Sequence, residues 1–234
     1  YNGINATLAT NKSNTLMSAL GGDVTQAFAA SALLNGVLAP DTQAYASYFA
    51  DPGTGRIANN GLARQMLQVA KVIEARATLG HTRDVFFVAL ANFDTHNNQL
   101  TSQAALLAQV SFALGAFDKA MTQLALSAKV TAFTLSDFGR TLQPAAGSPP
   151  GSDHAWGNHH FIVGGAVKGG LYGSFPTLAL GGPDDSSSEG RWIPTTSIEQ
   201  YGSVLARWFG VADADMASVF PNIGRFNAGP SFMA

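Results

Sequence analysis

Acidic and imidazole side chains gather in three short stretches of this sequence. They are Asp94 and His96 in FDTH, Asp137 in LSDFGR, and Asp153, His154, His159 and His160 in GSDHAWGNHH. Because Asp94 and His96 are two positions apart, their side chains lie on the same side of an extended backbone and can reach one ion. Mixed carboxylate and imidazole ligands suit Zn, Mn or Fe, whereas Mg and Ca take mostly oxygen.

A metal ion needs at least three ligands that converge, and spacing alone does not show convergence. An Asp-x-His pair is common by chance, and an aspartate after a strand often only accepts hydrogen bonds from loop amides. His159 and His160 cannot both face one ion from an extended backbone, so at least one of them packs or supports the site from outside. The expected cofactor is a divalent metal, with Zn, Mn or Ca as the candidates.

Arg140 lies just after the second apolar run of the chain. Its guanidinium could clamp an oxyanion such as phosphate or sulfate, or it could pair with Asp137 or cap a helix end. We predict Arg140 and His160 as the catalytic residues. Ser136 lacks the glycine-flanked elbow of serine hydrolases, so we do not expect it to be a nucleophile.

The elements that must position these residues follow from apolar periodicity. Helices are expected over 23–38, 41–49, 62–79 with Gly80 at the end, 101–127, and after a capping box of Thr196 and Glu199. Continuous apolar runs at 84–93, 129–135 and 161–167 predict strands buried on both faces. Strand, long helix and strand in succession predict a right-handed unit with parallel strands. Ligands bind outside the carboxyl ends of such strands, where the three stretches would meet.

The expected fold class is therefore α/β, with a mostly parallel sheet flanked by helices. No internal repeat or low-complexity linker divides the chain, so residues 1–234 are expected to form a single domain. Within it, 1–60 would supply peripheral helices and loops, and 61–226 the core.

Composition excludes several classes of function. The net charge is -2 without a cluster of basic residues, which argues against nucleic acid and against an anionic membrane surface. There is no cysteine, so disulfides, thiolate nucleophiles and cysteine zinc sites are absent. No apolar run reaches the ~18 residues that predict a membrane span. Only 12% of residues are charged, so neutral polar groups must cover much of the surface, which is more usual outside the cytosol. The start at Tyr1 indicates a mature or truncated product.

Five stretches in order carry a resemblance to a known family. They are VFFVALANFDTHNNQ, VTAFTLSDFGRTL, GSDHAWGNHHFIVGGAVKGG, YGSFP and GRWIPTTSIEQYGSVLARWFGV. From about residue 60 to 226 they closely resemble the bacterial DUF1501 family, whose members are typically exported through the twin-arginine route. The resemblance implies a periplasmic or extracellular protein.

That family is grouped by fold with the alkaline phosphatase and sulfatase superfamily, so the resemblance also implies an alkaline-phosphatase-like core. Carried over residue by residue, the implied metal ligands are Asp94, His96, Asp137 and His154. Phe138 stands where the superfamily has a paired histidine, and a phenyl ring cannot bind a metal. One metal, or none, is therefore expected instead of two.

Members of the family usually have about twice this length, and the preceding part supplies a further strand and the candidate nucleophile region. The resemblance therefore implies that this chain is the C-terminal portion of such a domain, lacking its N-terminal part. The expected partner is the missing N-terminal portion of the same precursor, or another chain that covers an exposed sheet edge. A homo-oligomer is a further alternative.

Two functions of different classes remain. The first is a metal-dependent hydrolase of small phosphate or sulfate esters in an exported protein, with Arg140 steadying the negative charge that develops. The alternative is a non-catalytic exported binding or assembly protein that keeps a degenerate site. The clustered ligand-type residues favour the hydrolase, whereas Phe138 and the missing segment favour the alternative.

Overall fold

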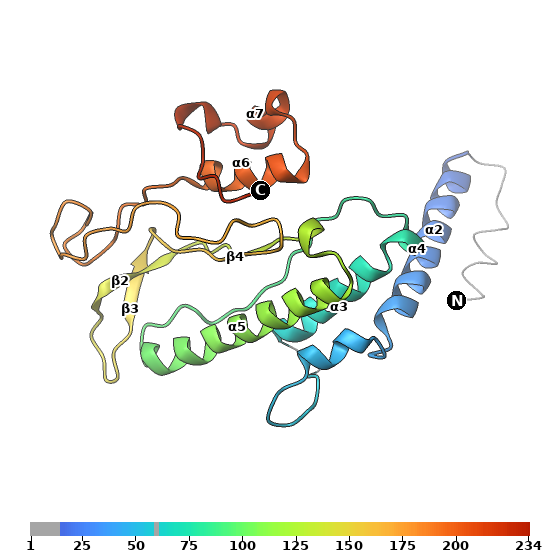
Figure 1. The fold of residues 1–234 in the computed structure, drawn as a ribbon, viewed down its shortest axis with the longest axis horizontal. Coiled ribbons are helices and arrows are strands. Elements are labelled where there is room, and N and C mark those ends of the chain that lie inside the picture. Colours follow the sequence, from blue (N-terminus) through green and yellow to red (C-terminus); the bar gives the residue numbers. More distant parts are fainter. Residues whose placement is uncertain (1–14, 59–60) are drawn as a thin grey trace.

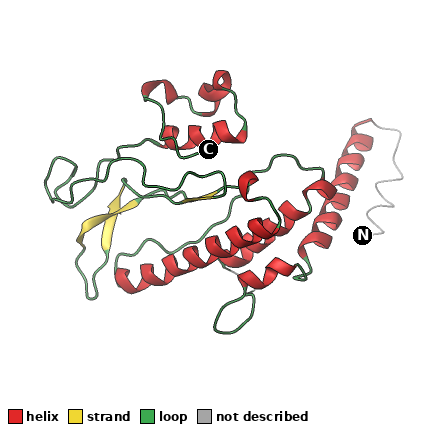
Figure 2. Ribbon diagram, viewed as in Figure 1, coloured by secondary structure: helices red, strands yellow, loops and turns green. Residues whose placement is uncertain are grey.

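Helices form most of the framework in the computed structural model, which describes residues 15–58 and 61–234 (Figures 1 and 2). The α-helices are α2 (Thr15–Leu38), α3 (Leu62–Glu74), α4 (Arg76–Leu79), α5 (Gln99–Gln123), α6 (Ile198–Phe209) and α7 (Met216–Val219). The 3-10 helices are η1 (Ala44–Phe49), η2 (Ser127–Lys129), η3 (Asp213–Asp215) and η4 (Ile223–Arg225). The strands are β1 (Ala132–Phe133), β2 (Gly139–Pro144), β3 (Ser152–Ala155) and β4 (Ile162–Val163).

Helices α3 and α5 pack against each other to form the main core. Leu67 and Ala70 of α3, together with Ala113 and Ala120 of α5, are completely buried. These residues recur at helical spacing along each helix, and the small alanines let the two helices approach closely. Both segments are helical as predicted, although the helix expected over 62–79 is interrupted at Ala75 and the one expected over 101–127 ends at Gln123.

The segment before α3 belongs to this core as well, although the sequence assigns residues 1–60 to the periphery. Tyr45 and Phe49 of η1 are buried in the same cluster. The buried amine of Lys71 in α3 donates to Asp41 Oδ1 at 2.6 Å and to the Leu38 carbonyl oxygen at 2.8 Å. One lysine thus ties the end of α2 to α3. Residues 1–14 of the expected periphery lie outside the described part of the chain.

The expected mostly parallel sheet is wrong, and with it the alkaline-phosphatase-like α/β core. The described strands form two small antiparallel pairs, β1 with β4 and β2 with β3. In the first pair Ala132 faces Val163, and in the second Arg140 faces His154. No ladder joins 129–135 to 84–93 among the described residues, so the predicted parallel pairing does not occur.

The run 84–93 forms no strand in the structure. It returns from α4 to the beginning of α5 as a loop (Figure 1). Its burial alternates: Val88 and Leu90 pack against the helical core, whereas Phe87, Ala89 and Ala91 are exposed, a period typical of extended chain. The apolar run predicted a strand buried on both faces, and this is wrong: one face is exposed, and residues 84–91 have no ladder partner among the described residues.

Helix ends follow local capping chemistry. Gly80 ends α4 with φ of 72°, as predicted, because glycine adopts the left-handed region without a steric penalty. The capping box of α6 lies one residue later than predicted. Ser197 Oγ accepts from the Gln200 N–H at 3.1 Å, and Gln200 Oε1 accepts from the Ser197 N–H at 3.0 Å. Ser197 is extended and Ile198 begins the helix, so Ser197 and not Thr196 is the cap.

By length and composition, α5 could also cross a membrane. It contacts α3 and η1 and supplies Ala113, Ala116, Phe117, Ala120 and Met121 to the core, as a core helix does. Length and apolar composition do not separate these two roles, so the absence of a membrane span stays a prediction.

A second, smaller core joins Tyr201 and Leu205 of α6 to Phe232 near the end of the chain.

The loop before α6 is organised around one carboxylate. Asp185 accepts backbone hydrogen bonds from Gly181, Ser187, Gly190 and Arg191, all at 2.9 to 3.0 Å. Although burial raises the pKa of Asp185, these donors outweigh it and lower the pKa to about 2.

Replacing Asp185 with asparagine is expected to make the stability of the protein depend less on pH in the acid range. The folded pKa lies below the value of ~3.9 for an unfolded aspartate, so this stabilisation is present above that value and is lost as the pH falls toward 2. Thermal unfolding between pH 6 and 2 should show a smaller fall in Tm for Asp185→Asn than for wild type. An equal fall in both proteins would contradict the assignment.

Candidate metal centre

A glycine allows the two parts of the centre to touch. The segment that leads into β3 lies against the backbone that precedes α5, where the Ser152 N–H donates to the Thr95 carbonyl oxygen at 3.2 Å. A Cβ atom on Gly151 would lie 2.1 Å from the carbonyl carbon of His96 and 2.3 Å from the Thr95 oxygen. Only glycine permits this approach, which places the GSDH stretch directly on FDTH.

The β2–β3 pair then sets the positions of Arg140 and His154. The two residues face each other in the register, so their side chains emerge side by side. The Arg140 side chain is only 11% exposed. Its Nη1 donates to Asp94 Oδ1 at 2.8 Å, its Nε donates to Ser152 Oγ at 3.2 Å, and its Nη2 donates to the Ser152 carbonyl oxygen. Arg140 therefore anchors Asp94 to β3.

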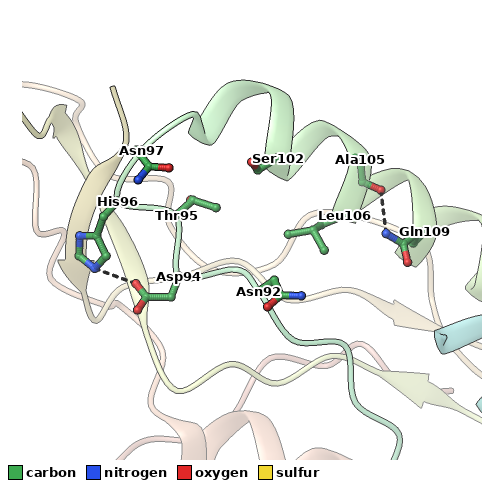
Figure 3. Close-up of a pocket in the computed structure, with 9 residues that line it drawn as sticks. All are labelled: Asn92, Asp94, Thr95, His96, Asn97, Ser102, Ala105, Leu106 and Gln109. Carbon is green, nitrogen blue, oxygen red and sulfur yellow. Dashed lines mark hydrogen bonds and ion pairs between the residues drawn. The ribbon is translucent and has the colours of Figure 1, made fainter. Parts of the chain in front are cut away.

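Asp94, His96 and His154 converge to form one cluster. Asp94 Oδ1 lies 2.7 Å from His154 Nε2 and 2.9 Å from His96 Nε2. The two Nε2 atoms are 3.3 Å apart. All three side chains are about half exposed, and Figure 3 shows the His96 ring turned toward the Asp94 carboxylate. The cluster is thus open to solvent on one side.

These distances and donors fit a transition metal. Zn–N bonds of ~2.0–2.1 Å in a tetrahedral site place ligand atoms roughly 3.3 Å apart, which matches the two Nε2 atoms. The Asp94 contacts are shorter, so the carboxylate must move outward by a few tenths of an ångström. His96 Nδ1 lies 3.3 Å from Asp153 Oδ1, a pairing that leaves the Nε2 lone pair free for a metal. Two imidazoles among three donors favour Zn or Mn over Ca.

The charges around Asp94 favour its ionised form. The hydrogen bond from His154, followed by the hydrogen bond from Arg140 and the nearby imidazoles, holds the pKa of the Asp94 carboxyl below its ordinary value. Asp94 is therefore ionised at neutral pH, as a metal ligand must be.

A cavity of about 420 Å³ lies beside the cluster, between the backbone at 92–97 and the first turns of α5 (Figure 3). Its lining residues are Asn92, Asp94, Thr95, His96, Asn97, Ser102, Ala105, Leu106 and Gln109. Most of them carry amide or hydroxyl groups, and Asp94 is the only carboxylate among them. The cavity therefore offers neutral hydrogen-bonding groups next to the metal ligands.

The other predicted site residues lie elsewhere. Asp137 is exposed in a bend before β2 and is not part of the cluster. His160 is half buried against the Tyr201 ring, with centroids 5.6 Å apart, and burial followed by the charge of His159 lowers the pKa of His160. His159 is exposed and stacks on Phe175 at 5.3 Å. Neither histidine is a member of the three-residue cluster.

Three supporting residues did not follow from sequence reasoning. They are Gly151, Ser152 and Gln99, and none of them has a side chain or spacing that signals a role in the sequence. Ser152 Oγ donates to Gln99 Oε1 at 2.5 Å while it accepts from Arg140 Nε, so the two residues fix the arginine that holds Asp94. No spacing rule connects these positions, because their contact depends on how two loops pack.

Gly151→Ala is expected to abolish or strongly weaken metal binding at this cluster while α3 and α5 stay folded. The added methyl group would overlap the His96 backbone, so β3 must move away and carry His154 with it. Zn²⁺ affinity measured by competition with a chromophoric chelator, with helix content from circular dichroism, checks this. Gly169→Ala is the matched control, because nothing lies within 4 Å of its added Cβ. Unchanged affinity in Gly151→Ala would contradict the packing argument.

With this geometry in place, comparison with known proteins defines the class of the chain. Residues 10–192 match the model of the DUF1501 family, described as a protein of unknown function. The chain belongs to the DUF1501 family. Searches of curated proteins and of solved structures found no match.

Proposed function

We propose that this protein binds a divalent metal, Zn or Mn, through Asp94, His96 and His154, and that it hydrolyses phosphate or sulfate esters there. The observation that carries the proposal is the convergence of these three ligands from two chain segments. His96 and His154 are 58 positions apart, and their Nε2 atoms still lie 3.3 Å from each other. Exposed acidic groups are common, but two imidazoles facing one carboxylate are the donor set of a catalytic metal.

When bound, such a metal polarises an ester oxygen and activates a water molecule. The chain's own residues prepare this site. Asp153 holds His96 through Nδ1, and Arg140 holds Asp94 through Nη1. The guanidinium expected to clamp an oxyanion is therefore turned toward Asp94 and Ser152, and we assign Arg140 as a positioning residue. The neutral lining of the adjacent cavity would hydrogen-bond the ester.

One further part of the proposal comes from the sequence. Export to the periplasm or the extracellular space is supported by the low charged fraction of 12%. It is not needed for metal binding at the cluster.

A non-catalytic binding or assembly protein is the second candidate function. The observation that favours it is the position of Arg140, whose Nε, Nη1 and Nη2 all donate to Asp94 or Ser152. Transition-state stabilisation of an ester needs donors directed at the developing charge. A protein that binds a metal without turning over esters would fit this arrangement.

Elemental analysis of the purified protein, followed by assays with p-nitrophenyl phosphate and p-nitrophenyl sulfate with and without a chelator, tests the proposal. We expect about one Zn or Mn per chain and chelator-sensitive hydrolysis of one of the two esters. One bound metal without hydrolysis would support the second candidate. Failure to bind any metal at neutral pH would overturn both the metal centre and the hydrolase.

A further inference from the structure

One face of α5 lines the cavity beside the metal centre. Ser102 lies three and four positions before Ala105 and Leu106, and Gln109 follows these two by the same steps. Residues at this spacing lie next to each other on one side of a helix. The face therefore has an apolar centre, with a hydroxyl group at one end and an amide group at the other.

Most of the polar groups around the cavity have no partner in the protein. Asn92 and Asn97 line it from the loop before α5, and they and Ser102 form no side-chain hydrogen bond with any described residue. Gln109 Nε2 donates to the Ala105 carbonyl oxygen of its own helix at 3.4 Å, a long hydrogen bond (Figure 3). These amide and hydroxyl groups are therefore available to a ligand.

The lining also restricts the chemistry of that ligand. Among the described residues that line the cavity there is no lysine or arginine, so a second anionic group would find no cation there. The one ring is the His96 imidazole, which faces Asp94, so an aryl group or a nucleobase has no free ring to stack on. Ala105 and Leu106 are too few to bury an acyl chain. A neutral molecule with several hydroxyl groups remains.

The size and the layout of the cavity agree with such a molecule. Its volume of about 420 Å³ falls in the range of ~300–1,000 Å³ that is usual for small-molecule sites. A sugar ring has apolar C–H faces and a rim of hydroxyl groups. The α5 face has the complementary layout, because Leu106 lies between the polar ends at Ser102 and Gln109.

We propose that the cavity binds the alcohol part of the substrate, and that this part is a neutral polyhydroxylated molecule such as a sugar ring. A C–H face of the ring would lie on Leu106, and its hydroxyl groups would bond to Ser102, Gln109 and Asn92. Because Asp94 also lines the cavity, the ester group would reach the metal ligands there. The inference rests on the proposed function for the ester group, whereas the occupant of the cavity is tested without a metal.

NMR titration of the full chain without added metal tests the occupant. The probes are the methyl α-glycosides of glucose, galactose and mannose, with cyclohexanol and p-nitrophenol as control alcohols. We expect at least one glycoside to shift the side-chain amide signals of Asn92 and Gln109 until they saturate, and neither control to do so. No shift with any of the glycosides, or equal shifts with a control alcohol, would overturn the proposal.

A substitution on α5 tests the assigned contacts. Gln109→Leu removes one hydrogen-bonding group and should weaken binding of that glycoside by roughly 3–10-fold, the usual effect of one lost neutral hydrogen bond. Gln123→Leu is the matched control, because Gln123 is exposed at the other end of α5 and does not line the cavity. Equal affinities in the two variants would contradict the assignment.

The 6-sulfate and the 6-phosphate of the same sugar test the link to the metal centre and distinguish the two ester classes. On the Zn²⁺-loaded chain, one of them should bind at least ~10-fold more tightly than the uncharged glycoside, because the metal and the cavity then hold one molecule. If neither ester binds more tightly, the link is overturned. A chain that binds the glycoside but no Zn²⁺ would support the cavity assignment and overturn only the proposed function.

Discussion

His154→Ala is expected to lower the affinity of the protein for Zn²⁺ by well over 100-fold. Losing a residue that only supports a ligand already costs ~10–100-fold, and His154 is itself one of three ligands. Its Nε2 lies 2.7 Å from Asp94 Oδ1 and 3.3 Å from His96 Nε2, so its removal leaves only two donors from FDTH. Chelator competition at neutral pH measures the change, and any ester hydrolysis should fall in parallel.

His159→Ala is the matched control for this substitution. It removes a histidine from the same stretch, but one that stacks on Phe175 and takes no part in the cluster. Its Zn²⁺ affinity should stay within about twofold of wild type. Equal losses in the two variants would show that the chain binds zinc through histidines in general and not through this centre.

Asp41→Asn is expected to destabilise the fold by about 3 kcal/mol, since breaking a buried ion pair by removing one partner costs ~3–5 kcal/mol and Asp41 is partly exposed. The Lys71 amine that it pairs with at 2.6 Å has no exposed surface. Burial raises the pKa of Asp41, but hydrogen bonds from Lys71 and Arg64 outweigh it and hold that pKa below its ordinary value. Urea unfolding at pH 7 measures the loss.

The variant Lys71→Met tests whether the loss of stability in Asp41→Asn comes from the buried charge of Lys71 or from the packing of its side chain. Methionine fills a similar volume without a charge, so the loss should be much smaller than in Asp41→Asn. Adding Lys71→Met to Asp41→Asn should recover most of the stability. If the double variant is less stable than Asp41→Asn alone, the cost of the single substitution does not come from an unpaired buried lysine.

The helices could be predicted well from the sequence, but the pairing of the strands could not. Apolar periodicity gives the faces of α3 and α5 because a helix makes its own backbone hydrogen bonds. A strand depends on its neighbours, so 84–93 and 129–135 show only that they prefer extended, apolar surroundings. The rule for parallel units treats them as partners, whereas β1 pairs with β4 and 84–91 has no strand beside it.

For the site, the sequence predicts which side chains could bind a metal, but it does not predict which of them lie close together. The spacing of Asp94 and His96 predicts ligands on one side of the chain, and the structure places His154 against them. In the sequence Asp137 is equivalent to Asp94, because both follow apolar runs. The β2–β3 register instead brings Arg140 opposite His154 and leaves Asp137 outside the cluster. The position of this strand pair against FDTH depends on the close contact at Gly151, which no pattern in the sequence signals.

The centre joins FDTH to β3, and an ion held there would act as a cross-link in a chain that has no cysteine. Such a clip closes a loop of nearly sixty residues, and restricting the unfolded chain in this way stabilises the folded one. Because the ion binds the folded chain, a free concentration 100 times its Kd adds ~2.7 kcal/mol to the free energy of unfolding. Metal supply would then govern how long the protein survives proteolysis, whether or not it turns over a substrate.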